Sequence, residues 1–217
     1  MTVKAVIVLA RRAVAFELDQ YRSLFRWICR RPDVPSDAVA FTYIGAVALL
    51  LWVFIVVSAI ELVVLHLLLP WETARVVADV LSFWGLVWMF GFMASFKVHP
   101  HLVGESGLRV RHGAGTDITV PWAAIATISV RERSRDKSRA VQLDRDKKGT
   151  VLNVVIGSRT NVNLTLRHPL VVALPKGEES VNEVRLYADD ARGLVSRARE
   201  HSALRQGISR PEGIERL

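Results

Sequence analysis

Three ionisable side chains lie within otherwise apolar stretches of this sequence. Glu61 and His66 are the only acidic or basic residues in the 29 positions from Phe41 to Leu69, and Asp79 is the only one in the 21 positions from Val76 to Phe96. Acids and histidines inside a membrane are costly and often mark a proton or ion path. They can equally hydrogen-bond one helix to another.

The spacing of these three residues favours contacts near one end of a helical hairpin. Each apolar run exceeds the ~20 residues that a bilayer core needs, and Pro70 ends the first run. The short connection makes the two helices antiparallel, which brings Asp79 between the levels of Glu61 and His66, where it could bond to either. We expect polar contacts within the hairpin. A proton relay, which would need further copies of the chain to enclose a pathway, and contact with a partner protein are the alternatives.

Two histidines follow the second apolar run, in the sequence His99-Pro100-His101. A pair of imidazoles can bind a metal ion, but no set of carboxylates or cysteines stands nearby at ligand spacing. The chain's one cysteine, Cys29, excludes an internal disulfide. No nucleophile–base pair or dinucleotide-binding glycine motif is present either. We therefore expect no metal site, no cofactor and no catalytic centre.

Composition places the whole chain in a membrane class. The 217 residues are 51% hydrophobic and carry a formal net charge of +8, a combination that is rare in soluble proteins of this size. We expect a two-helix transmembrane hairpin over residues 40–97, with spans at 41–69 and 76–96. Seven lysines and arginines precede the first span, whereas the connecting turn holds only Arg75. The positive-inside rule then places both termini in the cytoplasm and the spans in the cytoplasmic (inner) membrane.

Residues 1–31 form the second expected element, an amphipathic basic helix. At 100° per residue their apolar side chains fall on one arc and their basic side chains on another, as in helices that lie in a membrane interface. Packing of this helix against the cytoplasmic domain is the alternative. The residues expected to contact anionic lipid are Lys4, Arg11, Arg12, Arg22, Arg26 and Arg30.

Residues 98–203 have the pattern of a small α+β domain. About seven short alternating strands are followed by Asp189 or Asp190 as the N-cap of a C-terminal helix. One face of that helix is apolar: Leu194, Val195 and Ala198. We expect a small antiparallel barrel or sandwich that this helix caps. The charged segment from Arg131 to Lys148 is expected to be a solvated hairpin, and residues 204–217 a disordered tail.

The order of these segments resembles a known family. "GLRVRHG", "DITVPWAAIATISV" and the terminal "VRLYADDARGLVSRARE" are similar to the bacterial pleckstrin-homology-like (PH-like) domains found behind two-helix membrane anchors, over about residues 100–202. The resemblance implies a PH-like fold and a binding role rather than an activity. Eukaryotic relatives of this fold can bind inositol phosphates through basic residues of the first hairpin, which makes Arg109 and Arg111 a possible ligand face. The turn that follows them holds no lysine or arginine, and a solvated strand face is the alternative.

These features together favour an integral membrane scaffold or adaptor whose PH-like domain binds a protein or a lipid at the inner leaflet. Its expected partners are anionic membrane lipids and either a protein partner or further copies of the chain. The alternative is an accessory subunit of a membrane transporter or enzyme complex, with the hairpin as its contact surface. Nucleic-acid binding is not expected, because the basic residues are interleaved with acids and lack aromatic stacking partners.

Overall fold

The computed structural model describes residues 3–134, 140–146, 149–174 and 177–208. The chain divides into two compact units. One contains three long helices, and the other contains the strands and the C-terminal helix. The chain enters the second unit before the helical hairpin and returns to it at His101. The α+β fold class expected from the sequence is confirmed.

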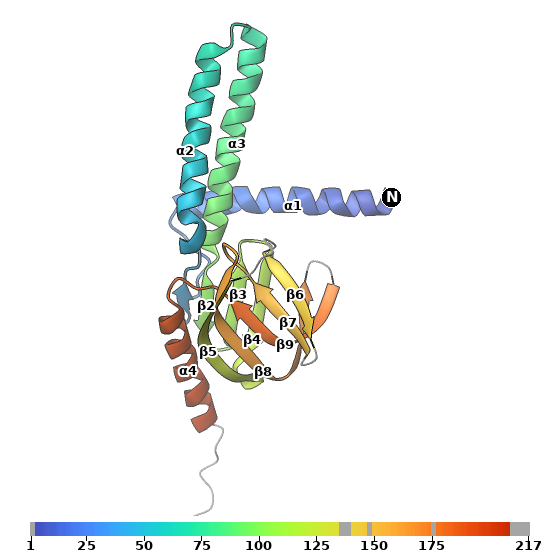
Figure 1. Ribbon diagram of the computed structural model, residues 1–217, viewed down its shortest axis with the longest axis vertical. Coiled ribbons are helices and arrows are strands. Elements are labelled where there is room, and N and C mark those ends of the chain that lie inside the picture. Colours follow the sequence, from blue (N-terminus) through green and yellow to red (C-terminus); the bar gives the residue numbers. More distant parts are fainter. Residues whose placement is uncertain (1–2, 135–139, 147–148, 175–176, 209–217) are drawn as a thin grey trace, which may run out of the picture. The chain divides into compact units, whose positions relative to one another are not determined.

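The helical unit consists of α1 (Val3–Ile28) and an antiparallel pair, α2 (Gly45–Leu68) and α3 (Glu72–Val98). Both α2 and α3 are long and apolar enough to cross a membrane. Helix α2 begins four residues after the expected start of the first span, and α3 ends two residues after the expected end of the second. Figure 1 shows α1 running across the axis of this hairpin.

Packing between α2 and α3 follows a heptad-like seam. The less exposed positions of α2 recur every three or four residues, as in left-handed helix pairs. These positions are Leu51, Ile55, Ser58, Leu62 and Leu65. In the first half of α3, two small residues are half-buried: Ala78 and Ser82. Small side chains let two helices approach closely in a membrane, where burial of apolar surface does not drive their association.

The second unit contains a four-stranded antiparallel sheet with the order β1-β2-β3-β4. Its strands are β1 (Val39–Phe41), β2 (His101–Gly104), β3 (Gly107–His112) and β4 (Thr116–Pro121). Strands β2, β3 and β4 lie in the region where the sequence predicts short alternating strands. The sequence does not predict β1, which pairs with β2 so that Val39 lies opposite Val103. The chain therefore joins this sheet both before and after the hairpin.

A five-stranded sheet completes the second unit, with the order β5-β8-β9-β7-β6. Its strands are β5 (Ile125–Ser134), β6 (Val141–Asp146), β7 (Gly149–Val154), β8 (Arg159–Leu174) and β9 (Gly177–Leu186). A short 3-10 helix, η1 (Trp122–Ala124), leads into β5. Strands β5 and β6 cover most of the charged segment, but they lie at opposite edges of this sheet and do not pair, so the hairpin expected there is wrong. Residues 135–139 and 147–148 lie outside the described ones.

Two features of the sheets correct the expected fold. The sequence predicts an antiparallel barrel or sandwich of about seven strands, but the sheets are not closed into a barrel and β7 pairs with β9 in parallel. The expected strands are short, whereas β8 has 16 residues, and its pairing with β9 is irregular between Thr165 and Leu170. Pro169 lies in this gap, and proline has no N–H to donate to a strand ladder.

Helix α4 (Ala191–Ile208) packs on a hydrophobic core that both sheets share. Its buried face is the one expected from the sequence: Leu194, Val195 and Ala198. The Asp190 carboxylate accepts a hydrogen bond from the Gly193 backbone N–H at 2.8 Å, which makes Asp190 the N-cap. The predicted disordered tail is wrong for residues 204–208, which continue α4, and residues 209–217 lie outside the described part of the chain.

Candidate functional site

His66 and Asp79 meet across the hairpin. His66 Nδ1 lies 2.8 Å from Asp79 Oδ2, within hydrogen-bonding distance. Of the two partners considered for Asp79, the structure therefore brings His66 to it. Ser58 Oγ also approaches α3, at 3.7 Å from the sulfur of Met89. These contacts can link the two helices without enclosing a pathway between them.

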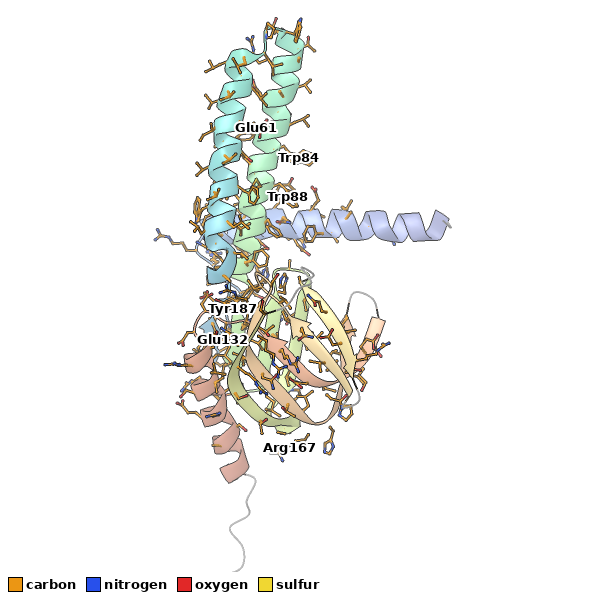
Figure 2. All side chains as sticks on the ribbon, viewed as in Figure 1. Glu61, Trp84, Trp88, Glu132, Arg167 and Tyr187 are labelled. Carbon is orange, nitrogen blue, oxygen red and sulfur yellow. The ribbon has the colours of Figure 1, made fainter. Side chains whose placement is uncertain are left out.

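Glu61 is exposed and stands apart from this pair. Five residues at about 100° each put Glu61 and His66 about 140° apart around α2. Within the described part of the chain, Glu61 makes no hydrogen bond or ion pair. It lies seven residues, or about 10 Å at 1.5 Å per residue, before the end of α2, and Figure 2 marks its place on the hairpin. A carboxylate thus faces outward from an apolar surface.

Helix α1 crosses α3 closely at Gly91. A Cβ placed at Gly91 would lie 3.2 Å from the backbone oxygen of Gln20, so a larger residue would push the helices apart. Gln20 and Ser23 are buried at this crossing. The two buried residues of α1 at this crossing are therefore polar, although the helix has an apolar arc of its own.

Two aromatic contacts hold the same pair of helices. The Trp84 indole N–H donates a hydrogen bond to the Tyr21 hydroxyl at 2.6 Å. The Lys97 ammonium lies 5.2 Å from the centre of the Trp27 ring, within range of a cation–π contact. Both contacts join a residue of α1 to one of α3, on either side of the Gly91 crossing.

The apolar arc of α1 remains exposed. Its exposed side chains include Val14, Leu18, Phe25 and Ile28. By helical geometry, the face that contacts α3 lies between this arc and the basic arc. Helix α1 therefore presents a polar face to α3, an apolar face on one side and a basic face on the other.

The basic arc is exposed at each residue that the structure describes: Arg11, Arg22, Arg26 and Arg30. Arg22 lies 3.5 Å from Asp19, and Arg26 lies 3.2 Å from Asp33. The backbones of Lys4 and Arg12 belong to the same helix, but their side chains lie outside the described ones. Exposed ion pairs are worth little, so these contacts leave the arginines able to bind phosphate groups.

Arg109 and Arg111, the expected ligand face, both approach Asp117 on β4. Arg109 Nε donates to the Asp117 carboxylate at 2.6 Å, and Arg111 Nε lies 3.6 Å from the same group. Arg111 is buried, whereas the Arg109 side chain is 38% exposed. An anionic ligand would meet Arg109 first and would compete with Asp117 for it. The ligand role of this face stays a prediction.

His101 is buried and engaged at both ring nitrogens. Its Nδ1 accepts the Arg111 backbone N–H at 3.0 Å, and its Nε2 lies 3.0 Å from the Tyr187 carbonyl oxygen, which fixes the proton on Nε2. The Tyr43 ring packs against it, with centroids 4.5 Å apart. Burial is the main cause that lowers the pKa of His101 to about 4. His101 therefore links β2, β3 and the end of β9 as a neutral imidazole.

The other histidine of this pair, His99, lies at the end of α3. Its Nδ1 is 2.9 Å from the Ser95 carbonyl oxygen. Among the described residues, no three histidines, cysteines or acidic residues are grouped as a metal site would require. The two histidines thus contact protein groups in their respective units.

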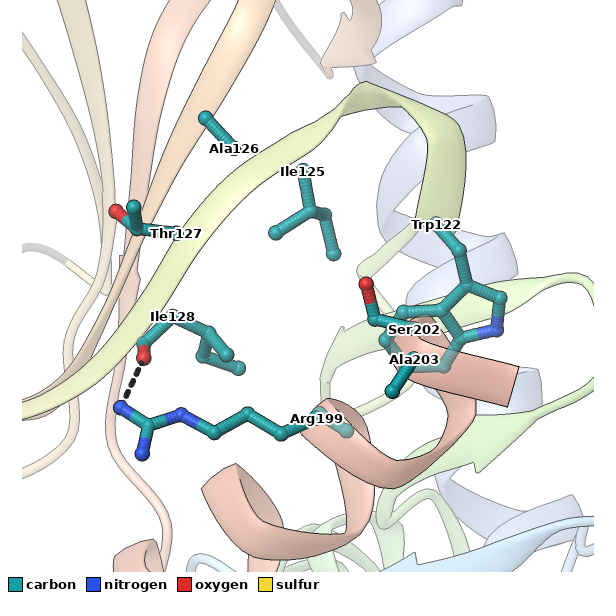
Figure 3. A pocket seen from close by; sticks show the side chains of 9 residues that line it. Trp122, Ile125, Ala126, Thr127, Ile128, Arg199, Ser202 and Ala203 are labelled. Carbon is teal, nitrogen blue, oxygen red and sulfur yellow. Dashed lines mark hydrogen bonds between the residues drawn. The ribbon is translucent and has the colours of Figure 1, made fainter. Parts of the chain in front are cut away.

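A groove of about 320 Å³ lies between β5 and α4 (Figure 3). Its apolar lining includes Trp122, Ile125, Ile128 and Ala198, and its polar lining includes Thr127, Arg199 and Ser202. The Trp122 indole N–H donates to the Gly104 carbonyl at 3.0 Å, and its ring stacks on His201. No pattern in the sequence predicts this groove.

Comparisons of the chain with protein-family models, with curated proteins and with solved structures found no match.

Stability of the β-domain should fall in acid because of His101. Its pKa is about 6.5 in the unfolded chain, whereas burial lowers the pKa in the folded protein to about 4. Between these values the unfolded state binds more protons, so stability that is present above pH 6.5 is lost as the pH falls toward 4. We expect a loss of about 3 kcal/mol over this range, measured by denaturant unfolding of the detergent-solubilised protein.

The control for this experiment is His101→Gln, whose side chain is neutral at every pH. The variant should be less stable than the wild type at neutral pH, because its amide does not reproduce both ring contacts. Its free energy of unfolding should nevertheless change by about 3 kcal/mol less across the same pH range. The same pH dependence in both proteins would show that His101 does not cause the acid sensitivity.

Proposed function

We propose that this protein is an integral membrane scaffold or adaptor whose cytoplasmic β-domain, of PH-like type, binds a partner at the membrane surface without catalysis. The proposal is carried by the helical unit. Two of its helices are long and apolar enough to cross a membrane, and an amphipathic basic helix crosses one of them at Gly91. This combination fits a hairpin in the bilayer beside a helix in its interface.

Distances along α3 support this placement. Gly91 lies nineteen residues after Glu72, the first residue of α3, which corresponds to about 28 Å at 1.5 Å per residue. The hydrocarbon core of a bilayer is ~30 Å thick. A bilayer that ends at α1 would therefore have its other surface near Trp71, whose side chain is exposed. Tryptophan is enriched at such interfaces.

The three faces of α1 also suit an interfacial position. Its exposed apolar arc would enter the lipid, and its basic arc would meet the head groups. Each arginine near an anionic surface contributes about 1 kcal/mol of attraction. Anionic phospholipid is therefore the proposed partner of α1, and the excess of basic residues before α2 and after α3 supports cytoplasmic termini.

The PH-like assignment and the partner-binding role rest on the second unit. Support for the assignment comes from the sequence resemblance and from α4, which packs on a core shared by two sheets. Support for binding comes from the groove between β5 and α4. A protein or a lipid at the inner leaflet remains the class of partner proposed for this domain.

A second candidate function is favoured by Glu61. An exposed carboxylate within an apolar span is costly unless a neighbour hydrogen-bonds to it, and the described residues supply none. A transmembrane helix of another protein, with a polar or basic residue at that depth, would satisfy it. The chain would then be an accessory subunit of a membrane complex, with the hairpin as its contact surface.

Affinity purification in mild detergent distinguishes these two functions. An accessory subunit should purify with a stoichiometric membrane protein that Glu61→Leu releases. Glu61→Gln is the matched control and should retain that protein, because the amide still hydrogen-bonds, whereas neither variant should alter insertion. Wild-type protein that purifies with lipid alone would reject the subunit function.

Topology can be tested by cysteine labelling in a Cys29→Ser background. A cysteine at Thr73, beside the hairpin turn, should react with a membrane-impermeant thiol reagent in intact cells. A cysteine at Ser158, in the β-domain, should react only after lysis. Labelling of Ser158 in intact cells would reverse the proposed orientation.

Lipid binding by α1 can be tested with a peptide of residues 1–31. The peptide should become helical on vesicles that contain phosphatidylglycerol, and salt should weaken its binding because basic side chains supply the attraction. Replacement of Arg22 and Arg26 by glutamine should weaken binding by about 2 kcal/mol, or roughly thirtyfold.

The control peptide carries Leu18→Gln and Phe25→Gln on the apolar arc. It should also bind more weakly, but its remaining affinity should keep the salt dependence of the wild type. A peptide that ignores these vesicles and binds a fragment of residues 98–217 would show that α1 instead packs on the β-domain.

A further inference from the structure

We propose that Glu61 of one copy of the chain bonds to His66 of a neighbouring copy, so that the hairpins associate side by side in the membrane. This inference rests on the proposed transmembrane position of the hairpin and specifies a second copy of the chain as its partner. It concerns only α2 and α3, which both belong to the helical unit.

Glu61 lies deep in the proposed bilayer. Asp79 is seven residues, or about 10 Å, after the start of α3, and its contact with His66 puts both residues at this depth. Glu61 is five residues, or about 7.5 Å, further from the hairpin turn on α2. Its backbone is therefore about 18 Å from the level of Glu72 and about 10 Å from that of Gly91. Neither layer of head groups surrounds its carboxylate.

The polar groups of the hairpin are only partly satisfied within one chain. Among the described residues, Glu61 makes no hydrogen bond or ion pair, and Asp79 Oδ1 is buried without a hydrogen-bond partner. The same residues engage His66 only at Nδ1. The His66 side chain is 56% exposed, which leaves its ring open to a partner outside the hairpin. Unsatisfied polar groups in hydrocarbon are costly, so a neighbour that bonds to them stabilises the assembly.

The chemistry of the two side chains allows this bond in either of two protonation states. The Asp79 carboxylate can only accept, so His66 Nδ1 carries a proton and Nε2 is left for a second partner. A neutral ring accepts at Nε2 from protonated Glu61, whereas an imidazolium donates from Nε2 to the Glu61 carboxylate. The second form is charge-assisted and therefore stronger.

The positions of Glu61 and His66 around α2 favour a contact between copies. They lie about 140° apart, with Leu62 and Leu65 of the α2–α3 seam between them. Copies that have the same orientation in the membrane can therefore turn Glu61 of one toward His66 of the next. The offset of about 7.5 Å along the helix axis is within the combined reach of the two side chains. Each copy then uses two different surfaces, and such a heterologous contact can close into a ring.

Depth selects His66 among the basic residues that a second copy offers. The other basic residues of the two helices are Arg75 and Lys97. Along the helix axis they lie about 14 Å and about 20 Å from the level of Glu61, on opposite sides of it. The chain thus carries an acid and one basic group within reach of each other only when two copies meet. This complementarity favours a second copy over an unrelated protein as the occupant of this face.

The test uses full-length protein in lipid vesicles, in a Cys29→Ser background that is free of cysteine. Val57→Cys lies one turn before Glu61, and Ala59→Cys lies two turns before His66, both at exposed positions. The two positions differ by about 3 Å in depth. A variant with both cysteines should form a ladder of oligomers with a short bifunctional thiol reagent. Each single-cysteine variant should form no dimer with itself, because the contact joins different surfaces.

Removal of either side chain should reduce this crosslinking. Glu61→Leu and His66→Leu should each lower the crosslinked fraction about tenfold, since each removes the hydrogen bond between helices. Glu61→Gln should retain most of the ladder, because an amide still bonds to Nε2. His99→Leu is the matched control for the histidine and should leave the ladder unchanged, since the His99 ring contacts the carbonyl of Ser95 in its own helix.

Mixing the two leucine variants shows on which copy each residue acts. Protein with Glu61→Leu keeps His66, and protein with His66→Leu keeps Glu61. With Ala59→Cys on the first and Val57→Cys on the second, the mixture should form crosslinked dimers as the unsubstituted pair does. With the two cysteines exchanged, crosslinking should fall about tenfold. Crosslinking in the mixture also shows that both variants fold.

The proposal is wrong if the double-cysteine variant gives no crosslinked product, or if the mixture of leucine variants gives none. Dimers formed by one single-cysteine variant alone would indicate a two-fold contact and would also contradict it. A different membrane protein that Glu61→Leu releases would identify an unrelated chain as the partner and would overturn it as well. Labelling at Thr73 and Ser158 reports topology independently, so failure of this association is distinguishable from failure of the proposed membrane scaffold.

Discussion

The apolar surface of α2 and α3 is the constraint on which the rest of the structure depends. Leu49 and Leu67 are 78% and 76% exposed, and many of their neighbours are more than half exposed. Each CH₂ group kept in water costs about 0.8 kcal/mol, and patches of this extent mark a surface that something else covers. Helix α1 also leaves apolar surface exposed, because it packs on α3 through its polar face. Its apolar arc must therefore be covered by the same apolar surroundings as α2 and α3.

The helical unit could be predicted from the sequence because its signals are local. Run length and Pro70 give the two helices, and a period of 100° gives α1. The sequence predicts that Asp79 bonds to either Glu61 or His66. The structure shows that its partner is His66. The sequence predicts that the first span begins at Phe41, four residues before α2 begins. The difference arises because Phe41 belongs to β1, which pairs with β2 on the far side of the hairpin in the sequence. No pattern within a short window of sequence reveals such a pairing.

The β-domain was predicted less completely, since its features depend on contacts between distant residues. The alternation of apolar and polar residues predicts short strands such as β3 and β4. A capping aspartate followed by an apolar helix face predicts α4. The parallel pairing of β7 with β9 has no signal in either strand. The role of His101 was also not predictable from the sequence. Two nearby histidines indicate a possible metal site, and only the structure shows that His101 is buried and bonded within the domain. The groove depends on Arg199 and Ile128, which only the folded chain brings together.

The pairing of β1 with β2 has a consequence for the order in which the protein is made. On the ribosome, β1 emerges first and remains without a partner until both long helices and then β2 have been synthesised. Chains grow at about 5–20 residues per second, and domains generally fold as units. The first sheet is therefore completed only after the hairpin has left the ribosome. A chain whose synthesis stops before β2 therefore cannot form this sheet.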